Sequence, residues 1–148
     1  MPPIPVKPGI YKIHAHIIGA TSLLTATEYA VKHGAPVIVD RFNPLPIEQE
    51  WAIEPFEQVP GSPYVIRLAM HESAGLVIGE EKLFVNGVPR AEWEKFTFEG
   101  VLGGVKILSE KGLALRAGHR GAQIELSPPK PEFQETWTLE YSRPLTED

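Results

Sequence analysis

Tryptophan recurs along this chain at nearly constant spacing, and no other feature of the sequence constrains the fold as strongly. Trp51, Trp93 and Trp137 are separated by 42 and 44 residues. Each begins a similar segment, with the sequences WAIEPF, WEKFTF and WTLEY. The start of the unit recurs as well, because similar segments open at Tyr11, at Tyr64 and, with valine in place of tyrosine, at residue 105. This period predicts three similar units that share one core.

Proline and glycine interrupt the chain so often that a long helix is excluded. The 15 Pro and 13 Gly residues are scattered through the sequence, and each costs ~1 to ~3 kcal/mol inside a helix. Between these breaks, segments such as residues 11–16 alternate apolar and polar side chains, which is typical of a half-buried strand. We therefore predict one all-β domain over residues 1–148, with twelve short strands in repeats of approximately 8–58, 59–100 and 101–143.

This pattern resembles the β-trefoil, a six-stranded barrel capped by three hairpins. The resemblance covers the chain from about Pro8 to Arg143. It implies that the three tryptophans are anchors at related places in the core, because buried indole rings contribute a large apolar area. We therefore assign them no binding role.

Composition excludes several classes of protein. The chain has no cysteine, which excludes a disulfide framework, a thiolate metal site and a cysteine nucleophile. Nineteen acidic against 14 basic residues give a net charge of −5, whereas nucleic-acid binders usually present a basic face. No apolar run approaches the ~18 residues of a membrane span. The first residues lack the features of a signal peptide, so we expect a cytoplasmic monomer that binds neither nucleic acid nor membrane.

Motifs of catalysis and metal binding are missing from the sequence. It contains no Gly-x-Ser-x-Gly and no Gly-x-Gly-x-x-Gly segment. His71 and Glu72 match the first two residues of a zinc-protease motif, but Gly75 stands where its second histidine should be. His14 and His16 share one face of a predicted strand, yet two ligands without a third make a weak zinc site. We expect no enzyme, no metal and no cofactor.

Sugar binding is one alternative, because ricin-type trefoils carry Gln-x-Trp in each repeat. Gln49 fits that pattern, but the corresponding residues of the other units are Ala91 and Glu135. Sugar pockets of that family also use an aspartate in each unit, and this chain has only Asp40 and Asp148. At most one carbohydrate pocket could therefore form.

The chain is most similar to the mushroom β-trefoil serine protease inhibitors of the cospin and cnispin group. Those chains are acidic and free of cysteine, and they open with Gly-x-Tyr-x-Ile, which residues 9–13 (GIYKI) match. The resemblance implies reversible inhibition of a trypsin-like serine protease by one exposed loop that mimics a substrate, and a role in fungal defence. A sister family on this scaffold inhibits cysteine proteases, and Gly19 is the residue that could enter a papain-like cleft.

The three units differ in length between a leucine of the second strand and the tryptophan. The first unit takes 27 residues from Leu24, the second takes 17 from Leu76 and the third takes 24 from Leu113. Insertions in repeats map to loops. We assign the surplus to residues 28–35 and 43–47 in the first unit and mainly to residues 127–132 in the third.

The resemblance places the reactive residue in an expanded loop, where a Lys or Arg suits the buried carboxylate of a trypsin-like pocket. Lys32 ranks first. Its neighbours Val31 and His33 both keep their main-chain donors, so a protease could pair with the backbone there.

Three other residues are weaker candidates. Lys130 ranks second, because Pro131 removes the N–H that follows it, while Pro129 stiffens the preceding bond. Arg120 lies between glycines that are expected to leave it mobile. Thr27 stays possible, because the group that the chain resembles tolerates a polar uncharged residue at this position.

Overall fold

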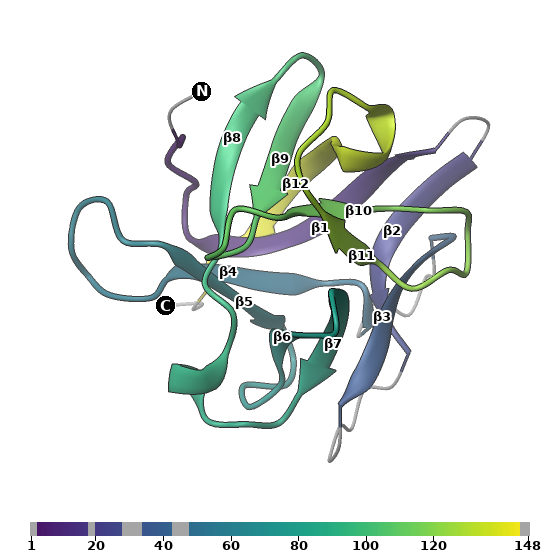
Figure 1. Ribbon diagram of the computed structural model, residues 1–148. Helices are drawn as coiled ribbons and strands as arrows, with labels where there is room; N and C mark the ends of the chain where they lie inside the picture. Colours follow the sequence, from purple (N-terminus) through teal and green to yellow (C-terminus); the bar gives the residue numbers. More distant parts are fainter. Residues whose placement is uncertain (1–2, 18–19, 28–33, 43–47, 146–148) are drawn as a thin grey trace.

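The structure is a computed structural model that describes residues 3–17, 20–27, 34–42 and 48–145. In these ranges the chain forms twelve β-strands and two short 3₁₀ helices (Figure 1). The prediction of an all-β chain with twelve short strands is confirmed. No helix within the described ranges is long and apolar enough to cross a membrane.

The strands follow one another in three groups of four. The first group is β1 (Gly9–Ile17), β2 (Ala20–Ala26), β3 (Ala35–Asp40) and β4 (Trp51–Pro55). The second is β5 (Tyr64–Leu68), β6 (Gly75–Gly79), β7 (Lys82–Asn86) and β8 (Thr97–Val101). The third is β9 (Gly104–Leu108), β10 (Ala114–Arg116), β11 (Glu125–Ser127) and β12 (Trp137–Arg143). The 3₁₀ helices η2 (Arg90–Glu92) and η3 (Phe133–Glu135) precede β8 and β12.

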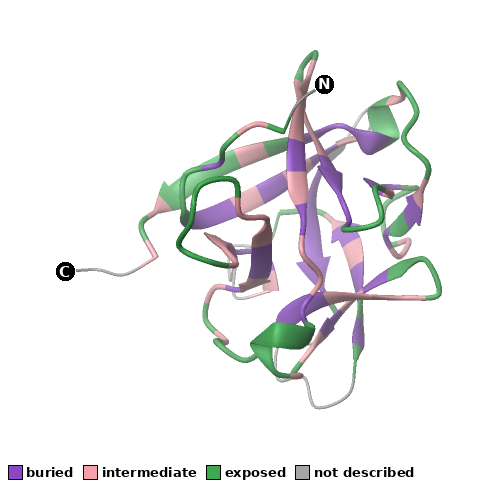
Figure 2. Ribbon diagram, turned by 60° about the vertical axis from the view of Figure 1, so that its left-hand side comes forward, coloured by how far each residue is buried: buried purple, intermediate pink, exposed green. Residues whose placement is uncertain are grey.

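Six strands close into a barrel. β1 pairs with β4 and β12, β4 with β5, β8 with β9, and β9 with β12. An antiparallel bridge between Tyr64 and Phe96 joins β5 to the start of β8 and completes the ring. Along β1, buried and partly exposed residues alternate from Tyr11 to His16, because successive side chains of a strand point to opposite faces. Buried segments recur along the other strands of the described chain (Figure 2). The barrel core includes Ile13, Ile53, Ile66, Phe98 and Ile107.

The other six strands form three hairpins that pair with one another. β2 pairs with β3, β6 with β7, and β10 with β11. β7 joins the other two hairpins by pairing with β3 and β11. A bridge between Ile38 and Gln123 links β3 to the segment before β11, so all three hairpins are in contact. A barrel of six strands with three hairpins is the arrangement that the resemblance implied.

The segments that open the three units occupy equivalent positions in the barrel. The register pairs each of them with an aromatic anchor: Tyr11 with Trp51, Tyr64 with Phe96, and Val105 with Trp137. The equivalence of the three openings is therefore confirmed, and all three anchors are fully buried.

Trp93 is buried, but it does not occupy the position that Trp51 and Trp137 share, so the expectation of three tryptophans at related places is wrong for Trp93. It precedes β8 by four residues, and Phe96 takes the barrel position because Phe96 is in register with Tyr64. The Trp93 indole Nε1 donates instead to the carbonyl of Val88, at 2.9 Å. The ring packs over Gly75 at the start of β6, where a Cβ atom would overlap with it. Trp93 is therefore buried against the second hairpin, at its Gly75 end.

Candidate functional site

The expanded loops are the turns of the first and third hairpins. Two residues separate β6 from β7 in the second unit, whereas eight separate β2 from β3 and eight separate β10 from β11. After the hairpins the units are alike, since ten, nine and nine residues precede Trp51, Phe96 and Trp137. The surplus assigned to residues 127–132 was therefore wrong, because it was measured to Trp93 instead of Phe96. The same count leaves a surplus of one residue for the segment that includes residues 43–47, which lie outside the described residues.

The main chain of Lys130 is engaged on both sides. Its N–H donates to Oε1 of Glu135 at 2.6 Å. Its carbonyl accepts hydrogen bonds from the Lys106 ammonium and from the N–H of Glu132. The side chain is exposed, but a protease that paired with the Lys130 backbone would have to displace these partners. Pro129 and Pro131 flank it and are exposed as well.

Glu135 organises the whole segment between β11 and β12. Its carboxylate is 0% exposed and accepts from Lys106 Nζ at 3.0 Å and from Arg116 Nη1 at 3.3 Å. Arg116 also pairs with Glu132 at 2.9 Å, and this hydrogen bond is the main reason that the pKa of Glu132 lies below its usual value. A buried carboxylate is costly unless it is paired, so this ion cluster fixes the segment that carries Lys130.

Arg120 lies at the tip of a tight turn. The N–H of Ala122 donates to the carbonyl of His119 at 3.0 Å, and Gly121 has a φ of +91°. The Gly121 N–H donates to the carbonyl of Val39 in β3 at 2.7 Å. Arg120 is exposed, but the glycine after it serves a left-handed turn held against β3. The expectation that the two glycines leave this tip mobile did not allow for these hydrogen bonds.

Thr27 closes the first hairpin. Its N–H and its hydroxyl both donate to the carbonyl of Pro36, at 3.2 and 2.8 Å. These two hydrogen bonds hold Thr27, the last described residue before the loop, against β3. Lys32, Val31 and His33 lie outside the described residues, and so does Gly19 of the turn between β1 and β2.

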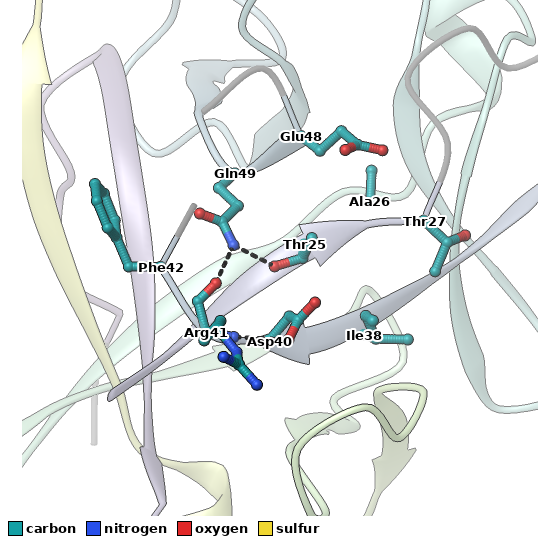
Figure 3. Close-up of a pocket in the computed structure, with 9 residues that line it drawn as sticks. All are labelled: Thr25, Ala26, Thr27, Ile38, Asp40, Arg41, Phe42, Glu48 and Gln49. Atoms are coloured by element: carbon teal, nitrogen blue, oxygen red, sulfur yellow. Dashed lines mark hydrogen bonds between the residues drawn. The ribbon is translucent and has the colours of Figure 1, made fainter. Parts of the chain in front are cut away.

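The first unit also contains a pocket of about 630 Å³ beside β2 and β3 (Figure 3). Gln49 is 2% exposed, and its amide Nε2 donates to Thr25 Oγ1 at 3.1 Å and to the Arg41 carbonyl at 2.7 Å. Burial raises the pKa of Glu48 at the pocket wall. The pocket is lined by Thr25, Ala26, Thr27, Ile38, Asp40, Arg41, Phe42, Glu48 and Gln49.

Gln49 has counterparts in the other units, and the residue assigned in the second unit is corrected. Glu94 and Glu135 precede Phe96 and Trp137 by two residues, as Gln49 precedes its tryptophan, so the counterpart is Glu94 and not Ala91. In the third unit the residue at this position is Glu135, whose carboxylate forms the ion cluster described above. The sequence marks Glu135 only as a departure from the sugar-binding pattern, because its partners Lys106 and Arg116 are distant in the chain.

The two strand histidines contact different partners. His14 Nε2 lies 2.6 Å from Glu140 Oε1, and His16 Nε2 lies 2.7 Å from Thr138 Oγ1. Among the residues that the structure describes, no group of three or more His, Asp or Glu side chains could hold a metal ion.

Comparison with known proteins identifies the architecture. The chain matches no protein-family model and no curated protein. It is similar to the solved structure of ThreeFoil, a designed threefold-symmetric protein, with a TM-score of 0.73, 17% identity, and coverage of 89% of this chain and 98% of that one. The fold is a β-trefoil.

Two natural β-trefoils show how broad this likeness is. The Rhizoctonia solani agglutinin has a TM-score of 0.74 and 11% identity, over 95% of this chain and 100% of that one. A proteinase inhibitor from Coprinopsis cinerea has a TM-score of 0.68 and 15% identity, over 93% and 100%. One of these proteins is an agglutinin and the other a proteinase inhibitor. At this identity the likeness shows the fold alone, and it does not assign the chain to the cospin and cnispin group.

Proposed function

We propose that this β-trefoil is a protein inhibitor of trypsin-like serine proteases, with Lys32 in the β2–β3 loop as the residue that fills the specificity pocket. The observation that carries the proposal is the expansion of this hairpin turn, with eight residues where the second hairpin has two. The third hairpin turn is expanded equally, but there the main chain after Arg120 is bound to β3. A Lys side chain in such a loop matches the buried carboxylate of a trypsin-like pocket.

The base of the hairpin suits a loop that is presented to a protease. Strands β2 and β3 pair in register from Leu23–Asp40 to Ala26–Val37, and Thr27 adds two hydrogen bonds to Pro36 beyond the last pair. Strand β3 is held from its other side by the main chain before β11. A fixed base lowers the ordering entropy that binding costs, which raises affinity.

The described competitors are less suitable for substrate-like binding. Such binding adds the inhibitor backbone to the protease as an extended strand, through main-chain hydrogen bonds. Both main-chain groups of Lys130 have partners inside the protein. Arg120 lies in a tight turn, and the N–H that follows it donates to Val39. The Thr27 N–H donates to Pro36.

A panel of proteases tests the class of target. We expect slowing of trypsin at micromolar protein, with weaker action on chymotrypsin and none on papain. A serine protease panel that shows no slowing at that concentration would remove the proposal. Inhibition of papain alone would favour the cysteine protease alternative, in which Gly19 is the residue to replace.

The pocket of the first unit favours carbohydrate binding as a second candidate function. Gln49 donates hydrogen bonds to Thr25 Oγ1 and to the Arg41 carbonyl, and Asp40 and the exposed side chain of Phe42 line the same pocket. A carboxylate and an aromatic face are the groups that a sugar hydroxyl pair and a pyranose ring would contact. A glycan array tests this function, with Asp40→Ala expected to abolish any signal and a blank array for the parent protein contradicting it.

A further inference from the structure

Two large apolar side chains are exposed to solvent at the same groove of the third unit. Leu102, in the turn between β8 and β9, is 101% exposed, and Phe133 of η3 is 70% exposed. Both line one largely apolar groove of about 560 Å³, together with Val101, Lys106, Pro131, Glu132, Gln134 and Thr136. In Figure 1 the β8–β9 turn and the segment before β12 lie next to each other at the top of the molecule.

The main chain keeps both side chains exposed. Val101 pairs with Gly104, so Leu102 belongs to a two-residue hairpin turn, completed by Gly103 with a φ of +87°. Gly104 packs so tightly against the Trp137 carbonyl that a Cβ atom would overlap with it. The turn therefore cannot fold inward to bury its leucine.

Main-chain hydrogen bonds hold the segment that carries Phe133. Its carbonyl accepts from the N–H of Thr136 at 3.0 Å, and the carbonyl of Gln134 accepts from the N–H of Ala117 at 2.8 Å. Glu135, the next residue, is locked into the ion cluster. Exposing Leu and Phe in this way forgoes a stabilisation of the kind that burial supplies, so the arrangement points to a partner surface.

We propose that this groove is a self-association surface, occupied by the Leu102 turn of a second copy of this chain. The patch holds both a protruding leucine and a hollow beside it, which is what a twofold interface requires, since each copy offers the same patch. The adjoining ion cluster of Lys106 and Arg116 with Glu132 and Glu135 carries two cations and two anions. Two such patches repel each other less than the net charge of −5 would suggest.

The association is weak. Stable dimers bury about 800 Å² on each partner, and one hairpin turn with one 3₁₀ helix supplies less than that. We therefore expect a monomer at low micromolar protein and a dimer at high concentration. This inference does not depend on the proposed protease inhibition, because it involves neither β2 nor β3.

Sedimentation equilibrium from about 10 μM to about 1 mM tests the proposal. The average mass should rise from 16.4 kDa toward twice that value. Leu102→Asp should weaken the association at least about tenfold, and Val59→Asp should leave it unchanged, because Val59 is a large apolar residue, 55% exposed, in a different loop. A parent protein that stays at 16.4 kDa throughout would overturn the proposal, as would equal behaviour of the two variants.

The lack of native cysteine permits a test of the contact itself. In the twofold arrangement Leu102 of one copy meets Phe133 of the other, so a mixture of Leu102→Cys and Phe133→Cys chains should form disulfide-linked dimers at least about tenfold faster than a mixture of Leu102→Cys and Val59→Cys chains. Equal rates in the two mixtures would show that self-association uses another surface.

Discussion

Tyr64 and Phe96 exchange two main-chain hydrogen bonds. The Tyr64 N–H donates to the Phe96 carbonyl at 2.8 Å, and the Phe96 N–H donates to the Tyr64 carbonyl at 2.7 Å. This pair joins the first strand of the second unit, β5, to the start of its last strand, β8. Tyr11 and Trp51 join β1 to β4 in the same way in the first unit. Two tryptophans and one phenylalanine therefore occupy the three equivalent positions of the barrel.

Replacing Phe96 with Ala should destabilise the protein by about 3–5 kcal/mol, because the side chain is fully buried in the barrel. Phe96→Trp restores the residue type of the other two units and should cost less than Phe96→Ala. Urea denaturation of the three proteins measures the free energy of unfolding. A loss below about 1 kcal/mol for Phe96→Ala would show that the anchor lies elsewhere.

Gly75→Ala should destabilise the second hairpin through Trp93. The added methyl group would overlap with the indole ring, and such overpacking costs about 1–3 kcal/mol. In a Trp93→Ala background the same methyl group enters vacated space, so the two changes should be less than additive. A double-mutant cycle based on thermal unfolding checks this coupling, and strict additivity would contradict the packing described.

Loss of the Glu135 carboxylate should destabilise the segment before β12. Glu135→Ala leaves Lys106 and Arg116 without their shared partner, and breaking a buried ion pair costs about 3–5 kcal/mol. Glu125→Ala is the matched control, because Glu125 is an exposed glutamate of β11. Denaturant unfolding near pH 7 should separate the two variants, and similar losses would refute the role given to the cluster.

Acid should remove part of the stability that Glu132 contributes. Its hydrogen bond to Arg116 lowers the pKa from the usual 4.5. A carboxyl group whose pKa is lower in the native state than in the unfolded chain stabilises the fold at pH values above the unfolded pKa. That contribution is lost as the pH falls through the native pKa. Glu132→Gln should therefore lose less stability than the parent between about pH 6 and about pH 3. Urea midpoints at the two pH values decide this, and an unchanged difference would argue against the Arg116 pair.

Much of the fold could be predicted from the sequence, because the barrel openings and two of the anchors recur visibly. Trp93 misled the alignment of the second unit with the other two, since residue identity alone does not reveal register. The main-chain pairing with Tyr64 selects Phe96, three residues later. This shift made the loop before β12 seem expanded and drew attention to Lys130.

The candidate site was less predictable. The sequence indicated Lys130 and Arg120 as exposed cations but could not show that their main-chain groups have partners. Lys106 and Val39 are distant in the chain, and Glu135, five residues after Lys130, carries no sequence sign that it is buried. The exposure of Leu102 could not be predicted either, since the sequence of a turn does not show whether another part of the chain covers its leucine.

The inhibition constant for trypsin, compared between Lys32→Ala and Lys130→Ala, tests the central claim most directly. We predict that Lys32→Ala weakens inhibition at least about 30-fold, the loss of about 2 kcal/mol that marks a hot spot. Lys130→Ala should inhibit within about threefold of the parent, because only an exposed side chain is removed. Unchanged inhibition by Lys32→Ala, with loss in Lys130→Ala, would contradict the account and place the reactive residue between β11 and β12.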